Sequence, residues 1–484
     1  MPARTGEQYL EGLQDGREVW LDGQRVADVA EHPDLRRAAR SVAALFDLQQ
    51  AEPSTFLMAD PHTGEPVNVN HLIPRSPADL TRRHVAIERV ATETVGLLGR
   101  SPDYLNVTLA GFAGRCDVWA MNGNDRGAAN LVAYQKECAR RDLALTHAIV
   151  NPTVDKSVPE VEAGGGEVVL HKVADTSNGI VVSGARALAT LAPFADEIFI
   201  YPGQPIPKDA NRYALVFSIP LKTPGLKILC RDSYSDKGDR HDHPFSSRFD
   251  EQDAVVIFDD VEVPRDRIFL DGDTEVYNKV MTTGWVANVM QQTTIRALAK
   301  LDFAYELVTC MVEAVKAGNP STWEMLGEVW SYAELTRAAL CAAEAGAHEY
   351  GNGVWFCDER PFRALRPTLP RWFPRINEII KLLGAHSLLA TPTAAELAEP
   401  ALRGLIDRYY AGAGALGADE RTRIFRTAWD FAGSALGGRN ELYERFYLAS
   451  AARTYQIAHF AAQADRKGQP SLLDRVLASD GDLL

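Results

Sequence analysis

The strongest constraint on the fold is a β-rich stretch, residues 146–270, that lies between two long segments of helical periodicity. Four runs within it are dense in Val, Ile, Leu, Phe and Thr and are bounded by Gly, Pro, Asp or Asn, as strands are. They cover residues 167–172, 179–201, 213–230 and 254–269. This order predicts an α+β protein that is mainly α: a helical N-terminal domain (1–145), a middle β-domain (146–275) and a C-terminal helical bundle (276–484).

Helix and turn signals fill in the flanking segments. Thr5 and Gln8 have the spacing of a capping box, and Asp22-Gly23 is typical of a tight hairpin within residues 18–26. A second capping box is predicted at residues 321–324. Helices are predicted over residues 34–49, 76–98, 105–143, 283–317, 321–350, 393 onward and 418–464, the last with a break at 433–439, so that the chain is helical after residue 271.

Composition restricts the classes of function. The 484 residues are 46% hydrophobic and 24% charged, and no apolar run reaches the ~18–20 residues of a membrane span. The N-terminus lacks the basic and apolar regions of a secretory signal, so we expect a cytoplasmic protein. A net charge of −14 argues against binding to nucleic acid or to an anionic membrane surface.

Neither a metal site nor a nucleotide-binding motif is predicted. The six cysteines are scattered without a CxxC pair, so we expect reduced thiols and neither disulfides nor structural zinc. His241-Asp242-His243 has two imidazoles at alternate positions but no third ligand cluster nearby, which favours an ordered polar loop. Residues 164–166 are three glycines that lead into a strand and not a helix, which predicts a turn and no phosphate-binding loop.

Three polar residues stand out because they flank predicted element boundaries. Arg100 and Tyr104 surround the break at Pro102, and His147 begins the β-domain. A fixed cation, a phenolic donor and an imidazole together would bind a phenol and favour its phenolate, whereas a free phenol ionises only near pH ~10. The same residues would equally suit a surface Arg and Tyr with a capping or core His. The residue pattern alone leaves both interpretations open.

Several segments in order along the chain resemble the flavin-dependent aromatic hydroxylases typified by the oxygenase component of 4-hydroxyphenylacetate 3-monooxygenase. The resemblance implies the fold of the acyl-CoA dehydrogenases, in which the middle domain is a β-barrel. The matching segments are residues 4–10, 99–106, 147–152, 179–190, 242–248, 255–269 and 441–446.

The resemblance also implies roles for individual residues. Arg100, Tyr104 and His147 would surround the substrate hydroxyl as catalytic and substrate-binding residues, and Thr190 would lie near flavin N5. Further FAD contacts are implied for His147, Ala148, Ile149, Val150, Thr153, Val154, Asp155, Lys156, Ser450, Ala451, Ala452 and Arg453. The last four begin a predicted helix, whose N-terminus suits a phosphate.

One loop departs from the family pattern. After the strand that ends at Tyr201, the family can carry small hydroxyl residues that hold the tail of the substrate. This chain has Pro202-Gly203-Gln204-Pro205 there, so Gly203 and Gln204 are expected substrate contacts of different chemistry. The identity of the phenol is therefore open: 4-hydroxyphenylacetate, tyrosine, a halophenol or a phenol tethered to a carrier protein.

The resemblance implies the following reaction. FADH2 arrives from a separate NAD(P)H:flavin reductase, O2 adds at C4a, and the hydroperoxyflavin hydroxylates the phenol in the ortho position to give a catechol. No metal takes part, and the family assembles as a homotetramer.

The residues bear on three rival functions. An acyl-CoA dehydrogenase needs a carboxylate base, and no glutamate can be singled out for it. A radical hydroxyacyl-CoA dehydratase holds an iron–sulfur cluster, but Arg100 and Tyr104 stand where its first cysteines are expected. A scaffold protein would have no reason to keep Arg100, Tyr104, His147 and Thr190 together.

Overall fold

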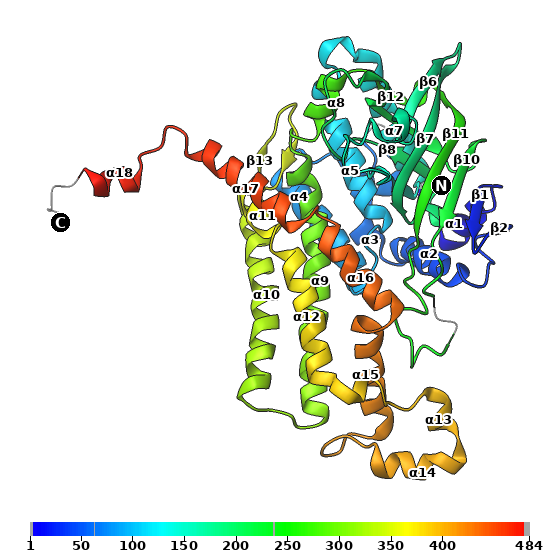
Figure 1. Cartoon of the computed structure of the whole chain (residues 1–484), viewed down its shortest axis with the longest axis vertical. Coiled ribbons are helices and arrows are strands. Elements are labelled where there is room, and N and C mark those ends of the chain that lie inside the picture. Colours follow the sequence, from blue (N-terminus) through cyan, green and yellow to red (C-terminus); the bar gives the residue numbers. More distant parts are fainter. Residues whose placement is uncertain (1–2, 62, 236–237, 479–484) are drawn as a thin grey trace.

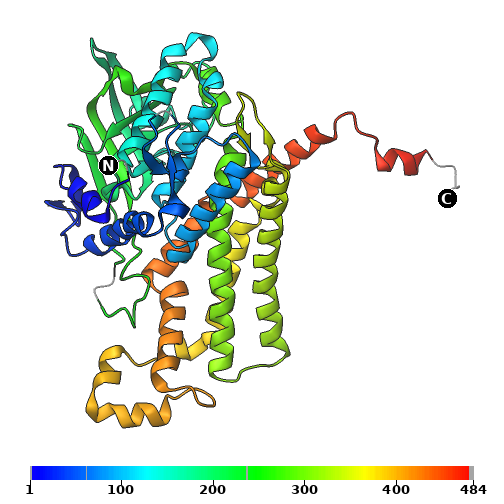
Figure 2. The same ribbon diagram turned by 180° about the vertical axis from the view of Figure 1, so that it is seen from behind.

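The computed structural model describes residues 3–61, 63–235 and 238–478. Figures 1 and 2 show two β-sheets with several N-terminal helices at one end of the molecule and long, nearly parallel helices at the other. The C-terminal helices extend away from the body of the chain (Figure 1). The protein is therefore an α+β chain that is mainly helical, as the sequence predicts.

The N-terminal segment confirms the predicted cap and hairpin. In the capping box of α1 (Gly6–Gly12), Thr5 Oγ1 accepts the Gln8 N–H at 3.2 Å. Strands β1 (Glu18–Leu21) and β2 (Gln24–Val26) meet at Asp22 and Gly23, both with positive φ. The elements that follow are α2 (Arg36–Ala51), α3 (Pro53–Phe56), β3 (Leu57–Ala59), β4 (Pro66–Asn68), α4 (Pro77–Glu93), α5 (Pro102–Gly114), α6 (Cys116–Trp119) and α7 (Asp125–Arg141).

The helix predicted over residues 105–143 is interrupted. Helix α5 ends before Arg115, which has non-helical backbone angles, and Asn122 has a φ of 56°. The four-residue helix α6 and a 3-10 turn at Met121–Gly123 therefore separate α5 from α7, because Asn and Gly at 122–124 tolerate left-handed backbone.

The central strands form two open sheets in the described part of the chain. These strands are β5 (Leu145–His147), β6 (His171–Asp175), β7 (Gly179–Thr190), β8 (Glu197–Ile200), β9 (Leu215–Pro220), β10 (Leu226–Cys230), β11 (Asp253–Pro264) and β12 (Ile268–Asp271). One sheet has the order β2-β1-β10-β11-β7-β6, and the other has the order β12-β9-β8-β5. The N-terminal hairpin joins the first sheet because β1 pairs in parallel with β10.

The implied β-barrel is not what these strands form. The two sheets pack face to face through one apolar core, where Phe217 of β9 and Phe258 of β11 meet edge to face at 6.0 Å. Each sheet keeps its own two edge strands, so no ladder of hydrogen bonds closes a circle among the described residues. Three glycines at 164–166 lie in a turn before β6, as predicted.

The C-terminal half is organised around the 30-residue helix α9 (Trp285–Ala314). This helix packs against α4, α5, α10 and α12, and most of its residues are buried. The other elements are α8 (Thr274–Val280), α10 (Pro320–Ala345), β13 (His348–Glu349), β14 (Trp355–Phe356), α11 (Glu359–Leu365), α12 (Leu369–Gly384), α13 (Ala394–Ala398), α14 (Pro400–Tyr409), α15 (Ala418–Ala432), α16 (Ala435–Phe446), α17 (Ala451–Arg466) and α18 (Leu472–Leu477).

Two details of this half differ from the prediction. The short hairpin β13–β14 interrupts a segment predicted to be helical throughout. The capping box of α10 uses Asn319 and Thr322, not residues 321 and 324, because Pro320 suits the first helical position and leaves Asn319 as the cap. The box of α13, Thr393 with Glu396, is where it was predicted.

The polar loop before β11 has a structural role at Asp242. Its carboxylate accepts the Ala394 N–H at 3.0 Å at the start of α13 and lies 3.7 Å from the guanidinium of Arg426. No group of three or more His, Cys, Asp and Glu in the described ranges is arranged to hold a metal ion. All six cysteines are free. Within those ranges no helix combines the length and apolarity that a membrane crossing requires.

Candidate active site

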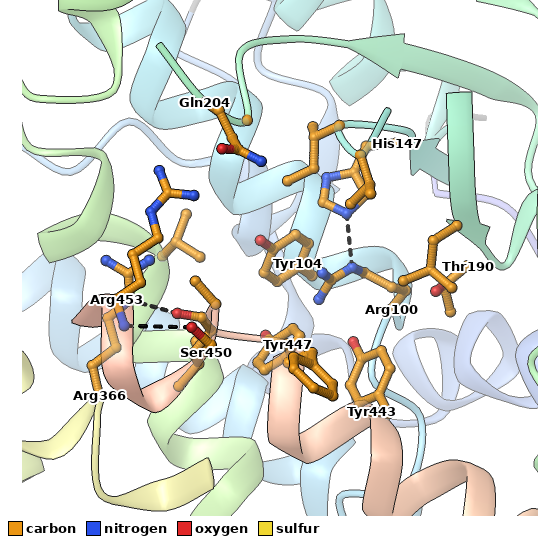
Figure 3. A pocket seen from close by; sticks show the side chains of 18 of the residues that line it. Arg100, Tyr104, His147, Thr190, Gln204, Arg366, Tyr443, Tyr447, Ser450 and Arg453 are labelled. Carbon is orange, nitrogen blue, oxygen red and sulfur yellow. Dashed lines mark hydrogen bonds between the residues drawn. The ribbon is translucent and has the colours of Figure 1, made fainter. Parts of the chain in front are cut away.

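The three residues singled out by sequence come together at the ends of elements. Pro102 stands in the first turn of α5, so Arg100 immediately precedes the helix and Tyr104 lies within its first turn. His147 ends β5, and the parallel pairing with β8 places it opposite Phe199. Figure 3 shows the side chains of Arg100, Tyr104 and His147 facing one another.

A chain of hydrogen bonds determines the protonation state of His147. Arg100 Nε, which can only donate, lies 2.9 Å from His147 Nε2, so that nitrogen accepts. The proton of the neutral ring is then on Nδ1, which donates to the Tyr201 hydroxyl. Burial, and then the positive charge of Arg100, hold the pKa of His147 well below its usual value. The imidazole is therefore a neutral acceptor that holds the guanidinium in place.

Aromatic rings surround the Arg100 guanidinium. Its Cζ lies 4.1 Å from the ring centre of Tyr104 and 4.4 Å from that of Tyr447. Burial raises the pKa of Tyr104 to about 12, although Arg100 opposes the shift. Tyr104 thus stays a neutral donor while Arg100, only 7% exposed, stays the cation. The environment favours an anion, such as a phenolate oxygen, beside Arg100.

Two carboxylates, the buried Glu251 and the half-buried Asp253, fix the backbone and side chains around this trio. Glu251 accepts the N–H groups of Gly99 and Arg100 at 3.0 and 2.9 Å and pairs with Arg439 Nη1 at 2.7 Å. Asp253 accepts both Nε and Nη2 of Arg439, at 2.8 and 2.6 Å, and the hydroxyl of Thr190 at 2.8 Å. Burial opposes ionisation of Asp253, but Arg439 outweighs it and holds the pKa of Asp253 well below its usual value.

These groups line one cavity of about 590 Å³, where β5, β7 and the loop after β8 meet α5, α9 and α16. The predicted site residues in its wall are Arg100, Tyr104, His147, Ile149, Val150, Thr190, Gly203, Gln204, Ser450 and Arg453. Met281, Trp285, Val286, Val289 and Met290 form an apolar wall. An apolar wall next to the buried Arg100 cation suits a flat aromatic ligand with one polar end.

Seven predicted residues lie elsewhere. Ala148 is buried behind the cavity wall, and Thr153, Val154, Asp155 and Lys156 are in an exposed loop. Ala451 and Ala452 are in the first turn of α17, outside the cavity wall itself. Their predicted contacts with FAD stay predictions.

The cavity has two chemically different ends. We call the first, formed by Arg100, His147, Thr190, Asp253 and Arg439, the Arg100 end. The second, formed by Arg366, Ser450 and Arg453, is the Arg453 end. Figure 3 shows both, with Gln204 extending over the space between them.

The Arg453 end suits the phosphates of a flavin nucleotide. Ser450 caps the 16-residue helix α17, whose N-terminus opens on the cavity. Arg366 donates to the Leu448 carbonyl at 2.9 Å, and burial, followed by the like charge of Arg453, lowers its pKa. Two guanidinium groups beside a helix N-terminus favour an anion. Among the described residues, two polar groups of residues that line the cavity, the Tyr443 hydroxyl and the Trp285 indole N–H, are buried without a protein partner. The cavity thus fits a polar aromatic cofactor.

Sequence reasoning missed several residues of the site. Tyr201, Asp253, Trp285, Arg366, Arg439, Tyr443 and Tyr447 all contact the trio or line the cavity. One available signal was the pair Tyr443 and Tyr447, four residues apart on α16, whose rings stack at 4.9 Å. Another was Arg439, an arginine that follows two glycines at a predicted helix break.

Two family models and several known proteins match most of the length of the chain. The family models for the 4-hydroxyphenylacetate 3-hydroxylase N terminal and C terminal match residues 5–270 and 277–477. The chain is 35% identical to the 4-hydroxyphenylacetate 3-monooxygenase oxygenase component of Thermus thermophilus, covering 94% of each chain.

Two further comparisons involve a carrier-bound substrate and a solved complex. The (3S)-3-amino-3-(3-chloro-4-hydroxyphenyl)propanoyl-[peptidyl-carrier protein SgcC2] monooxygenase of Streptomyces globisporus is 33% identical, with 92% of this chain and 84% of that one covered. A crystal structure of the oxygenase component of 4-hydroxyphenylacetate 3-monooxygenase, complexed with FAD and 4-hydroxyphenylacetate, superimposes with a TM-score of 0.89. It is 34% identical, and 96% of this chain and 98% of that one are covered.

Proposed function

Because the chain belongs to the 4-hydroxyphenylacetate 3-hydroxylase family, we propose that it is the oxygenase component of a two-component phenol monooxygenase. It uses FADH2 and O2 to place a hydroxyl group ortho to that of a phenol, and the products are a catechol, water and FAD. The observation that carries the proposal is the Arg100–His147 pair, buried beside Tyr104 in the same cavity wall as Thr190.

The Arg100 end would prepare the phenol. The Arg100 cation stabilises a phenolate oxygen, and neutral His147 holds the guanidinium so that it does not turn away. Tyr104 donates a hydrogen bond and presents its ring edge to His147 at 5.5 Å between centres. A phenolate is more electron-rich at its ortho carbon than the phenol is. These residues therefore both orient and activate the ring.

Reduced FAD, when bound, supplies two electrons and activates O2 beside the phenol. This chain would hold it with Thr190 at one end and with Ser450 and Arg453 at the other, while Trp285, Val289 and Met290 exclude water. The sequence has a GxGxxG spacing at residues 412–417, but it follows helix α14 and not a strand, so it is no dinucleotide-binding fingerprint. We therefore assign reduction of FAD by NAD(P)H to a separate flavin reductase. Because that reductase draws on NAD(P)H, we place both proteins in the cytoplasm.

The substrate carries a tail that passes Gly203 and Gln204. Gly203 has no side chain, and a Cβ there would approach the Ile149 carbonyl oxygen within 2.5 Å. The Gln204 amide is the polar group of this loop in the cavity wall. We propose a neutral or weakly polar tail, either free or extended as the thioester arm of a carrier protein. The Streptomyces globisporus relative acts on a carrier-bound phenol, whose tail also bears an amino group.

We further propose a homotetramer. Large apolar side chains of α17 and α18 are exposed, Phe460 at 66%, Leu472 at 76% and Leu477 at 74%. A second copy would cover them. Light scattering coupled to size-exclusion chromatography tests the assembly, and a monomer at micromolar concentration would contradict it.

Reconstitution with a flavin reductase tests the activity. The protein, FAD, NADH and a panel of 4-substituted phenols would be incubated in air, and catechol and hydrogen peroxide measured. We expect catechol with at least one phenol, and loss of catechol in favour of peroxide in Arg100→Met. Peroxide alone with every phenol, at a rate that Arg100→Met leaves unchanged, would refute the proposal.

A further inference from the structure

Thr190 is held through both its side chain and its backbone. Its Oγ1 donates to Asp253 Oδ1 at 2.8 Å, and its carbonyl accepts the Thr146 hydroxyl at 2.6 Å. Thr190 ends β7 and lies directly opposite Asp253, the first residue of β11. The side chain is 2% exposed and lines the cavity. Its position and rotamer are therefore set by the sheet.

The backbone around this pair is strained. Leu188, Leu191 and Gln252 all have left-handed φ values, 60°, 72° and 53°. Such a conformation costs a non-glycine residue about 1–2 kcal/mol. Three such residues lie within two positions of Thr190 or Asp253, and clusters of strained backbone of this kind are found at functional sites.

The charge of Asp253 decides which way the proton of Thr190 points. Both carboxylate oxygens accept from Arg439, at 2.8 and 2.6 Å, and Oδ2 also lies 3.3 Å from Arg231 Nε. A carboxylate between two guanidinium groups is ionised and can only accept. The single hydroxyl proton of Thr190 is therefore given to Asp253, and the oxygen is left with only lone pairs for the cavity.

An oxygen that can only accept distinguishes the two redox states of a flavin. N5 of oxidised flavin carries a lone pair, whereas N5 of reduced flavin carries a hydrogen. We propose that Asp253 is a positioning residue that fixes the Thr190 hydroxyl as an acceptor and thereby makes the site bind reduced FAD in preference to oxidised FAD. The inference rests on the proposed function, because it requires the flavin ring to lie at Thr190. Weaker binding of oxidised FAD would also let it dissociate after the reaction.

The test is the ratio of the dissociation constants of oxidised and reduced FAD, measured anaerobically without any phenol. The same ratio appears as a shift in the midpoint potential of bound FAD relative to free FAD. The wild-type protein should bind reduced FAD more tightly. In Asp253→Asn the amide can itself donate a hydrogen bond, so the Thr190 hydroxyl need no longer donate its proton to residue 253. We expect the ratio to fall about tenfold, which lowers the potential by about 30 mV for a two-electron couple.

Thr190 variants keep the inference testable if Asp253→Asn does not fold. Thr190→Val retains the Asp253–Arg439 pair but removes the acceptor, so it should lower the ratio as far as Asp253→Asn does. Thr190→Ser should keep the wild-type ratio. The double variant Asp253→Asn/Thr190→Val should lower it no further than either single change, because both act through one hydrogen bond.

Asp250→Asn is the matched control. Asp250 is 1% exposed and also pairs with Arg231, at 2.5 Å, but its bonded partners do not include Thr190. Its ratio should equal that of the wild type. An unchanged ratio in both Asp253→Asn and Thr190→Val, or a wild type that prefers oxidised FAD, would overturn the inference alone. A wild type that binds neither form of FAD would instead remove the proposed function.

Discussion

The two ends of the cavity differ in how completely their polar groups are paired. At the Arg100 end, Asp253 joins the side chains of Thr190 and Arg439, and Glu251 joins Arg439 to the backbone N–H of Arg100, in one network that reaches from β11 to α16. At the Arg453 end, Arg366 donates to one carbonyl, and the Ser450 hydroxyl accepts the backbone N–H of Arg453 at 3.4 Å. A network in which the polar groups are paired fixes the positions of its side chains, whereas guanidinium groups with unused N–H donors can bind a ligand. We therefore assign activation of the phenol to the Arg100 end and binding of the FAD phosphates to the Arg453 end.

The largest expected effect is loss of the charge at the Arg100 end. Arg100→Met removes a buried cation beside the substrate oxygen while keeping the length of the side chain. Catechol formation should fall by about 10³-fold, as when a preorganised electrostatic donor is lost. Rates should be measured at saturating reduced FAD, with Arg100→Lys as the control that retains charge but not the planar fork. A loss below tenfold in Arg100→Met would mean that the Arg100 end does not act on the phenol.

The second-largest effect is expected on the stability of the protein, from a buried carboxylate next to that network. Glu444 lies on α16 between Tyr443 and Tyr447 in sequence and pairs with Arg296 at 2.8 Å and Lys300 at 3.1 Å. Burial raises its pKa, but the two cations lower it overall from 4.5 to about 2. Stability from this pairing is present above pH 4.5 and is lost as the pH falls towards 2. Glu444→Gln should therefore be less stable at pH 7 by about 3 kcal/mol.

Denaturant unfolding at several pH values measures this difference. The gap between wild type and Glu444→Gln should narrow as the pH falls from 4.5 to 2. Asp302→Asn is a suitable control, because Asp302 pairs with Arg337 on the exposed side of α9. A gap that stays constant over that range would contradict the assignment of the charge to Glu444.

A smaller effect is expected at the Arg453 end. Arg453→Met should raise the dissociation constant for FAD about tenfold, because one charge-assisted bond to a phosphate is lost. Product formation at saturating FAD should change little, since the Arg100 end stays intact. Titration with FAD and with riboflavin separates the contributions. An equal loss of affinity for riboflavin, which lacks phosphate, would show that Arg453 does not bind the phosphates.

The smallest effect is expected from the loop that lies over both ends. Gln204→Ala should raise KM about fivefold for a phenol with a polar para tail, the cost of one neutral hydrogen bond. It should leave KM for 4-methylphenol unchanged, because that substrate has no polar tail. Initial rates with the two phenols give the comparison. A similar change for both would indicate a general distortion of the loop.

The sequence predicts elements that depend on neighbouring residues, but it does not predict contacts between residues that are far apart in the chain. The strands, the Asp22-Gly23 turn and the Thr5 cap follow from neighbouring residues, so they were predictable. The contact between Asp253 and Arg439 spans 186 positions, and neither residue is unusual in its own segment. Arg100, Tyr104 and His147 were found because they flank boundaries and match a family. Their partner Tyr201 sits among apolar residues and gave no such signal.

The pairing of β1 with β10 has a consequence for how the chain is made. Glu18 pairs with Lys227 and Trp20 with Leu229, so an N-terminal strand docks on a partner about 200 residues later. At about 5–20 residues per second, the ribosome needs about 10–40 s to deliver β10 after β1. During that interval the hairpin has a free edge and an apolar face without a sheet to cover it. Nascent chains stalled before residue 226 should therefore depend on a chaperone, whereas chains stalled well beyond residue 264 should not.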